Sequence, residues 1–274
     1  MMKKKIFTLM SVMTILAGTL TGCSGNSNEP KEVVYLEEFE ITDFFNNPNA
    51  YKGKHVKLTG QVFSIPQDDE ERMSIQIWHD VSNYDQDFIA HTEAGEDIKA
   101  NDYVIVDGKV DGTLKGENSF GGEVVSPLIV DAKVTKSSYK DIVTPTIAEI
   151  SPAVSQDQNG IVVTVDKVEY AKDETRLYVT IKNGTDYNFS CGVYSSKLVI
   201  DGQQLDQNNQ SMTIYNTPEL QELSYEVMAG TSSSGTVIFP AIEQNEPFQF
   251  VLPDSYSDNY DLMFTNYMID VPAK

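Results

Sequence analysis

Residues 55–65 read HVKLTGQVFSI, and every second position from Val56 to Val62 holds an apolar residue or a glycine. Side chains of a β-strand point alternately to its two faces, so this period of two predicts a strand with one buried face. Residues 103–110, YVIVDGKV, repeat the alternation. Three more strands are expected at 73–78, 87–91 and 128–134. Five short strands within about 80 residues predict a small closed or nearly closed barrel.

A short helix is expected just before the barrel, at Thr42–Pro48. Thr42 is a suitable N-cap, two phenylalanines provide apolar anchors, and Pro48 ends the helix because its ring disfavours helical geometry in the preceding residue. This helix is the single clear helical pattern that we expect in the chain.

The second half of the chain continues with strand patterns separated by turn residues. Alternation in 161–165 goes out of phase at Val168, which predicts a β-bulge at Asp166-Lys167. Further strands are expected at 177–181, 189–193, 197–200, 223–227, 236–239, 248–252 and 267–271. Seven or so short strands at this spacing predict a β-sandwich.

Both halves also resemble known families. Residues 49–62, NAYKGKHVKLTGQV, and 99–110, KANDYVIVDGKV, resemble the tRNA-anticodon-binding-like OB-fold family of secreted and lipoprotein chains. Residues 160–168, 176–185 and 229–239 resemble an immunoglobulin-like domain of unknown function that is common behind lipoprotein signals in Gram-positive bacteria. The resemblances imply an all-β chain, with an OB-like barrel followed by an immunoglobulin-like β-sandwich, and they carry over no catalytic residues.

The N-terminus predicts export and lipid attachment. Lys3, Lys4 and Lys5 precede a short apolar stretch, and residues 20–23, LTGC, resemble the lipobox of bacterial lipoproteins. The resemblance implies cleavage before Cys23, lipidation of its thiol with palmitate, and a location on the extracytoplasmic face of the cell membrane. We therefore divide the chain into a signal peptide (1–22), a flexible tether (23–32), a barrel domain (33–140), a linker (141–158) and a sandwich domain (159–274).

The charge and the cysteines narrow the classes of function. The chain has 41 acidic and 20 basic residues, a net charge of −21. Such a field repels nucleic acid and anionic headgroups, and it suits solubility, cations or a basic partner. If Cys23 carries lipid, Cys191 has no disulfide partner in the chain. We expect Cys191 to be a buried apolar residue rather than a nucleophile, because all three histidines are far away in the sequence.

The candidate ligand-binding residues lie on the second predicted strand. Trp78, the single tryptophan, shares the polar face of this strand with Ser74 and Gln76. An aromatic ring beside short polar groups suits a sugar ring or an extended peptide, and this part of an OB-fold often binds polymers. The alternative is that the linker or the sandwich domain covers Trp78, since large exposed aromatic side chains are uncommon without a use.

Metal sites have weak support in the sequence. His55, His79 and His91 lack the spacing of a zinc site, and His79 is expected to end a core strand. The acidic run Asp68–Glu71 is one candidate for calcium. The loop residues Asp254, Asp258 and Asp261 are the other, although neither group has EF-hand spacing and adjacent acids are more often solvated. We expect no cofactor and no metal.

No phosphate-binding loop, zinc-protease motif or nucleophile elbow occurs in the sequence. We therefore expect a non-enzymatic, lipid-anchored surface protein that binds or scaffolds a cell-wall glycan, a peptide or another envelope protein. One alternative is a cell-wall hydrolase that uses paired carboxylates, for which a convergent Asp/Glu pair in a cleft would be the sign. The other is a structural spacer.

Overall fold

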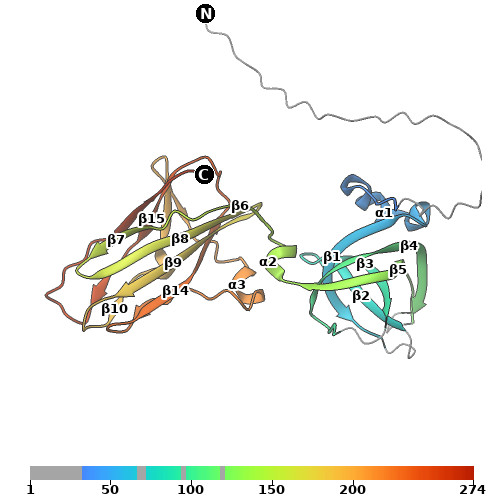
Figure 1. Ribbon diagram of the computed structural model, residues 1–274, viewed down its shortest axis with the longest axis horizontal. Helices are drawn as coiled ribbons and strands as arrows, with labels where there is room; N and C mark the ends of the chain where they lie inside the picture. The colour runs from blue at the N-terminus through green and yellow to red at the C-terminus, as the bar shows by residue number, and fades with distance from the viewer. Residues whose placement is uncertain (1–32, 67–71, 94–96, 118–120) are drawn as a thin grey trace, which may run out of the picture. The chain divides into compact units, whose positions relative to one another are not determined.

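The structure is a computed structural model that describes residues 33–66, 72–93, 97–117 and 121–274. The predicted signal peptide, Cys23, the tether and the acidic run Asp68–Glu71 lie outside the described residues. The predicted all-β class is confirmed, because strands dominate the described chain and the helices are short (Figure 1). Within the described ranges, no helix is long and apolar enough to cross a membrane.

The first half forms a closed five-stranded barrel, as predicted. Its strands are β1 (His55–Ser64), β2 (Arg72–Asp80), β3 (Asp85–Glu93), β4 (Tyr103–Glu117) and β5 (Glu123–Ser137). Their order around the barrel is β1-β2-β3-β5-β4, and only the β3–β5 pair is parallel. This circular order leaves no free sheet edge, which removes the risk of edge-to-edge pairing.

The apolar side chains of the alternating pattern fill the barrel interior. Val56, Leu58 and Val62 of β1 are buried, as are Val104 and Val106 of β4. Each fully buried aliphatic side chain contributes about 1.5–3 kcal/mol relative to exposure. Strands β3, β4 and β5 are longer than predicted. The added ends of β4 and β5 pair with each other and expose Leu114, Val124 and Val125, so no alternation of burial marks them.

One glycine in the barrel is required by packing. A Cβ atom on Gly60 would lie 2.3 Å from the backbone oxygen of Trp78 and 2.5 Å from Cγ2 of Ile77. Real Cβ atoms do not approach other atoms so closely, so β1 and β2 reach their separation only with glycine at this position.

The expected helix exists but begins earlier. It is α1 (Ile41–Asn46), between the 3-10 helices Glu38–Glu40 and Pro48–Tyr51. The predicted N-cap at Thr42 is wrong, because Thr42 lies inside α1 and Glu40 occupies the N-cap position. The aromatic anchor is confirmed. Phe44 is fully buried in the barrel core, where its ring meets Phe45 edge-on at 5.0 Å.

The second half is a β-sandwich with one shared core. Its first sheet has the order β14-β9-β8-β6, with β7 also paired to β8, and contains β6 (Thr146–Ile150), β7 (Val154–Gln158), β8 (Ile161–Ala171), β9 (Glu174–Asn183) and β14 (Ser232–Pro240). A second sheet has the order β12-β11-β15-β17, with β11 (Lys197–Ile200), β12 (Gln203–Asp206), β15 (Phe248–Leu252) and β17 (Tyr267–Val271).

Smaller elements complete the sandwich. A three-stranded sheet joins β10 (Phe189–Ser190), β13 (Glu226–Val227) and β16 (Tyr256–Ser257), and the short helices are α2 (Tyr139–Ile142), α3 (Thr213–Asn216) and the 3-10 helix Val193–Ser195. Residues from the sheets form one apolar cluster that includes Val163, Leu177 and Phe250. The predicted bulge is confirmed, because the β8–β9 register shifts between Val165 and Lys167.

The prediction of a linker over 141–158 is wrong for two segments. Residues 146–150 form β6 and residues 154–158 form β7, and both pair with β8. The β7 strand is hard to recognise because glutamines take the place of inward apolar residues. Gln156 Oε1 accepts a hydrogen bond from the backbone N–H of Met268, and Gln158 Oε1 accepts one from the N–H of Thr265.

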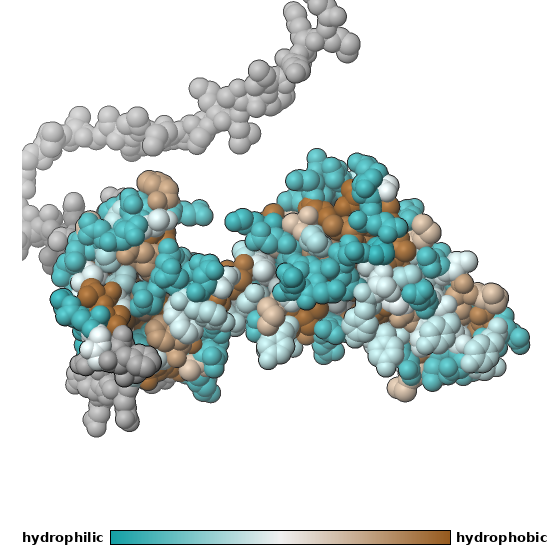
Figure 2. All heavy atoms as spheres, turned by 180° about the vertical axis from the view of Figure 1, so that it is seen from behind, coloured by the Kyte–Doolittle hydropathy of each residue, from teal (hydrophilic) through white to brown (hydrophobic). Residues whose placement is uncertain are grey.

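The surface agrees with the acidic, polar composition. On the face shown in Figure 2, hydrophilic residues cover most of the surface, and hydrophobic residues form separate patches between them. Several of the exposed large side chains are aromatic, among them Tyr84, Tyr194 and Tyr215.

Candidate ligand-binding sites

Trp78 belongs to an aromatic group on the outer face of the barrel. Its ring stacks on Phe63 of β1, with centroids 4.3 Å apart and planes inclined by 20°. Tyr84, from the turn between β2 and β3, meets the indole edge-on at 5.0 Å and is 63% exposed. The β1–β2 register shifts at this point, from Val62 opposite Ile77 to Ser64 opposite Gln76, so Phe63 is the extra residue of a β-bulge next to Trp78.

The three predicted binding residues share one face of β2, where Ser74, Gln76 and Trp78 are all half-buried. Residues of the barrel itself, Phe63 and Tyr84, lie against Trp78. Sequence reasoning missed both of them. Phe63 occupies the polar face of its strand, which was a usable signal, whereas Tyr84 has a left-handed backbone (φ 55°) in a turn that shows no periodicity.

Polar side chains of β3 continue this face. In the β2–β3 ladder Gln76 pairs with Ile89, and Trp78 pairs with Asp87. The carboxylate of Asp87 accepts a hydrogen bond from the hydroxyl of Ser126 on β5. The face therefore combines stacked rings with amide, hydroxyl and carboxylate groups, which can contact a ligand by both stacking and hydrogen bonding.

The histidines have separate structural neighbours. His79 Nδ1 lies 2.7 Å from the backbone oxygen of Thr59, and its ring stacks on Phe45 at 5.2 Å. His55 packs against Tyr35 at 5.5 Å, and His91 is the ladder partner of Ser74. His79 thus ends a core strand, as the sequence predicted.

The loop carboxylates proposed for calcium do not form a ligand group. Asp254 accepts a hydrogen bond from Ser195 Oγ at 3.4 Å, whereas Asp258 and Asp261 engage Asn188 and Asn259 through their backbone N–H groups. In the part of the chain that the structure describes, no three His, Cys, Asp or Glu residues gather closely enough to hold a metal ion.

Cys191 is buried in the sandwich, as predicted, and it carries no partner thiol among the described residues. Burial raises the pKa of its thiol to about 12, because the surroundings cannot solvate a thiolate. Its sulfur lies 3.9 Å from the backbone oxygen of Tyr225. A protonated thiol in these surroundings is a poor nucleophile.

An ionic cluster that the sequence did not reveal lies within the sandwich. The guanidinium of Arg176 on β9 is fully buried, and it donates to Glu169 at 3.0 Å and to Glu174 at 2.7 Å. Two threonines complete its hydrogen bonds, since Arg176 also donates to the hydroxyls of Thr144 and Thr146. We call Glu169, Glu174 and Arg176 the buried ionic cluster.

The two carboxylates of the cluster are both satisfied. Lys167 donates to Glu169 at 2.6 Å, and Thr213 donates to Glu174 at 2.9 Å. Burial by itself would raise the pKa of Glu169. The hydrogen bonds from Lys167 and Tyr178 and the charges of Lys140 and Arg176 outweigh that effect and lower the pKa to about 2. Both acids are buried and hydrogen-bonded within the protein, so they do not provide a carboxylate pair that faces substrate.

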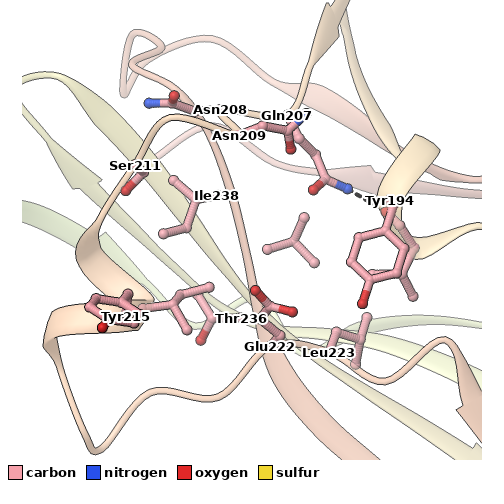
Figure 3. Close-up of a pocket in the computed structure, with 13 residues that line it drawn as sticks. Tyr194, Gln207, Asn208, Asn209, Ser211, Tyr215, Glu222, Leu223, Thr236 and Ile238 are labelled. Carbon is pink, nitrogen blue, oxygen red and sulfur yellow. Dashed lines mark hydrogen bonds between the residues drawn. The ribbon is translucent and has the colours of Figure 1, made fainter.

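A cavity of about 240 Å³ opens between the loops that flank β14 (Figure 3). Tyr194 and Tyr215 lie on opposite sides of it, and the carboxylate of Glu222 lies between them. The remaining lining residues are Val193, Gln207, Asn208, Asn209, Ser211, Ile214, Leu223, Thr236, Val237 and Ile238. We call this the tyrosine pocket.

A glycine brings one wall of the tyrosine pocket into place. A Cβ atom on Gly235 would lie 2.4 Å from the backbone of Leu223, so only glycine lets the segment at 221–223 lie against β14. The backbone N–H of Thr236 donates to the carbonyl of Gln221 at 2.7 Å and fixes the segment there. The segment then holds Glu222 at the cavity.

A second hollow, of about 410 Å³, is lined in part by Gln221 and by Gly235 of β14. Two carboxylates, Asp166 and Glu219, are among its lining residues, together with Tyr178 and Ser234. It is more open than the tyrosine pocket. Two acids line this hollow, which meets in part the sign expected of a hydrolase.

Comparisons with known proteins add little. No protein-family model and no curated protein matches the chain. Among solved structures, the chain is similar to a functionally unknown protein from Listeria monocytogenes EGD-e. That likeness has 13% identity and a TM-score of 0.36, and it covers 48% of this chain and 88% of the other.

Proposed function

We propose that this chain is a lipid-anchored, non-enzymatic binding protein of the bacterial envelope, located on the extracytoplasmic face of the cell membrane. The lipobox-like LTGC at 20–23 supports the anchor. The observation that carries the binding role is the group of Phe63, Trp78 and Tyr84 on the outer face of the barrel. Rings of this kind, next to Gln76 and Asp87, suit a cell-wall glycan or an extended peptide.

Nucleic acid is a poor ligand for the same face. Stacked aromatic rings do bind single strands in other OB-folds, but there a basic groove follows the phosphates. This chain has a net charge of −21, which opposes counterion release. We therefore expect this face to stack on the rings or planar groups of a ligand and not to bind phosphates.

The single tryptophan makes the binding test direct. Titration with solubilised peptidoglycan fragments or with extended peptides is expected to change the emission of Trp78, and titration with an oligothymidylate is expected to leave it unchanged. Trp78→Ala should then abolish binding measured by calorimetry, while Tyr260→Ala, which removes an 89% exposed tyrosine of the sandwich, should not affect it. An affinity that survives Trp78→Ala would reject the barrel face.

The anchor has its own test. Mass spectrometry of the protein from membranes should find Cys23 as the first residue, with acyl chains on it, and Cys23→Ser should release the protein from the membrane. An unmodified chain with residues 1–22 still attached, found in the cytosolic fraction, would reject this part of the proposal and leave the binding role to its own test.

The hydrolase alternative has one supporting observation, the presence of Asp166 and Glu219 at one hollow. Incubation of purified protein with peptidoglycan should release no reducing sugar. If it does, and if Asp166→Asn with Glu219→Gln removes the activity, the enzyme class replaces the binding class.

A further inference from the structure

We propose that the tyrosine pocket is a second binding site, which receives the cationic side chain of a lysine or arginine from a basic peptide segment of a partner protein. The site is in the sandwich and does not depend on the barrel face. Its ligand class follows from the charge, the rings and the hydrogen bonds of the pocket.

The charge of the tyrosine pocket favours a cationic ligand. Glu222 is the only charged residue that lines the described pocket, and its side chain is exposed. Among the described residues, no basic side chain forms an ion pair with Glu222. Lys197, which is close in sequence to Tyr194 of the pocket, pairs with Asp206. A carboxylate without a partner, in a protein of net charge −21, attracts and holds positive groups.

The two tyrosine rings of the pocket also favour a cationic ligand. Tyr194 is 65% exposed and Tyr215 is 82% exposed, and the two lie on opposite sides of the cavity with Glu222 between them (Figure 3). The face of an aromatic ring attracts cations through its quadrupole, and more strongly where the site is desolvated. An ammonium or guanidinium group in the pocket would meet both the rings and the carboxylate.

The polar lining residues argue against a sugar. Gln207 already donates to the carbonyl of Val193 and to Ser196, and Asn208 accepts from the N–H of Gln210. Ser211 donates to Glu174 of the buried ionic cluster at 2.6 Å. A sugar ring needs several donors and acceptors at once, and the bonds within the protein already use the donors of Gln207 and Ser211 and one acceptor of Asn208.

Size supports a single side chain. The cavity of about 240 Å³ is below the range of about 300–1,000 Å³ that is usual for pockets that enclose small molecules. A lysine or arginine side chain enters such a cavity, whereas the rest of a peptide would run over the surface.

The experiment compares side-chain analogues that differ in charge. Purified protein with ¹³C-labelled tyrosine is titrated by NMR with tri-lysine, with N-acetyl-lysine amide, with N-acetyl-norleucine amide and with chitotriose. The lysine ligands should shift the resonances of Tyr194 and Tyr215 in a salt-sensitive way, while the neutral norleucine analogue should not. Equal shifts from norleucine amide would reject the cationic site, and saturation by chitotriose alone would make it a sugar site.

Matched variants separate the contributions. Glu222→Gln should weaken tri-lysine binding by about fivefold, corresponding to about 1 kcal/mol. Glu226→Gln, which changes an exposed acid that lines neither this pocket nor the second hollow, should change it by less than about twofold. Tyr215→Phe should keep the affinity and Tyr215→Leu should reduce it, because the interaction needs the ring and not the hydroxyl. Equal effects of the two glutamate variants would overturn the proposal, whereas Trp78→Ala should have no effect.

Discussion

The barrel and the sandwich are both built from strands, but the structure stabilises them differently. The barrel interior is an apolar cluster that relies on Gly60 for the close approach of β1 and β2. The sandwich has an apolar core too, and it adds the buried ionic cluster around Arg176. The difference teaches that substitutions in the barrel core should act mainly through packing, whereas substitutions in the sandwich can also act through buried charge.

The two halves also carry separate reporters. Trp78, the only tryptophan, lies on the barrel, and Cys191, the only thiol besides Cys23, is buried in the sandwich. Tryptophan emission therefore follows barrel unfolding, and alkylation of Cys191 in a Cys23→Ser background follows sandwich opening.

The largest effect is expected from Arg176→Ala. It leaves the carboxylates of Glu169 and Glu174 buried without their shared cation, which typically costs about 3–5 kcal/mol. Alkylation of Cys191 should accelerate by roughly 100-fold or more, because about 1.4 kcal/mol corresponds to tenfold. The denaturation midpoint of Trp78 emission should not move. A shift of both reporters together would show that the two halves unfold as one unit.

The control for this variant is Lys115→Ala. Lys115 pairs with Glu123 at 2.8 Å on the barrel, and both side chains are largely exposed. Exposed pairs contribute about 0–1 kcal/mol. A cost for Lys115→Ala that matches the cost for Arg176→Ala would contradict the special role of burial.

Acid should weaken the sandwich through Glu169. Its pKa is about 2 in the folded protein, against an ordinary value of 4.5, so its contribution is complete above about pH 4.5 and is lost as the pH falls toward 2. A depression of this size corresponds to about 3 kcal/mol. Glu169→Gln should be less stable than wild type at neutral pH, and the gap should close near pH 2. Thermal unfolding between pH 2 and 7 measures this, and a constant gap would refute it.

Gly60→Ala should destabilise the barrel by about 1–3 kcal/mol, since the added methyl group overpacks a tight strand pair. The midpoint of Trp78 emission should fall while Cys191 alkylation stays slow. Gly116→Ala is the matched control, because no atom lies within 4 Å of the Cβ it would add. Equal losses for the two variants would argue against the close approach of β1 and β2.

The smallest effect is expected from Phe63→Leu. It removes the stack on Trp78 and should cost the barrel about 0.5–1.5 kcal/mol beyond the loss of buried area. The midpoint of the emission change, rather than its amplitude, is the measurement, since the indole surroundings change as well. An unaltered midpoint would mean that the two rings gain nothing from their contact.

Most of the fold was predictable because burial on one face imposes period two. Strands β11, β15 and β17 have the predicted bounds, and the bulge at Val165/Lys167 lies where the alternation changes phase. β7 was not predictable, because Gln156 and Gln158 bond to the backbone of the C-terminal segment where apolar residues would otherwise pack. The five strands of the barrel were predicted from their alternation, whereas their order around the barrel comes from the structure.

The sites were harder to predict. Arg176 and Tyr178 share a strand face that alternation assigns to solvent, and Thr144, Thr146 and Glu174 surround the arginine only in three dimensions. Tyr194 and Tyr215 come from two separate short helices and Glu222 from a loop, so the three share no period. Trp78 was singled out because it is unique and lies on a regular strand.

The contact between residues 221–223 and β14 has a further consequence, for association with other chains. β14 ends its sheet, and such strands invite pairing with strands of a neighbouring molecule. Here the chain fills that side itself, since Thr236 donates to Gln221 and the carbonyl of Ile238 accepts from the N–H of Asn208. Because these main-chain groups are already hydrogen-bonded, molecules of this protein at high local concentration gain little from pairing with one another through β14.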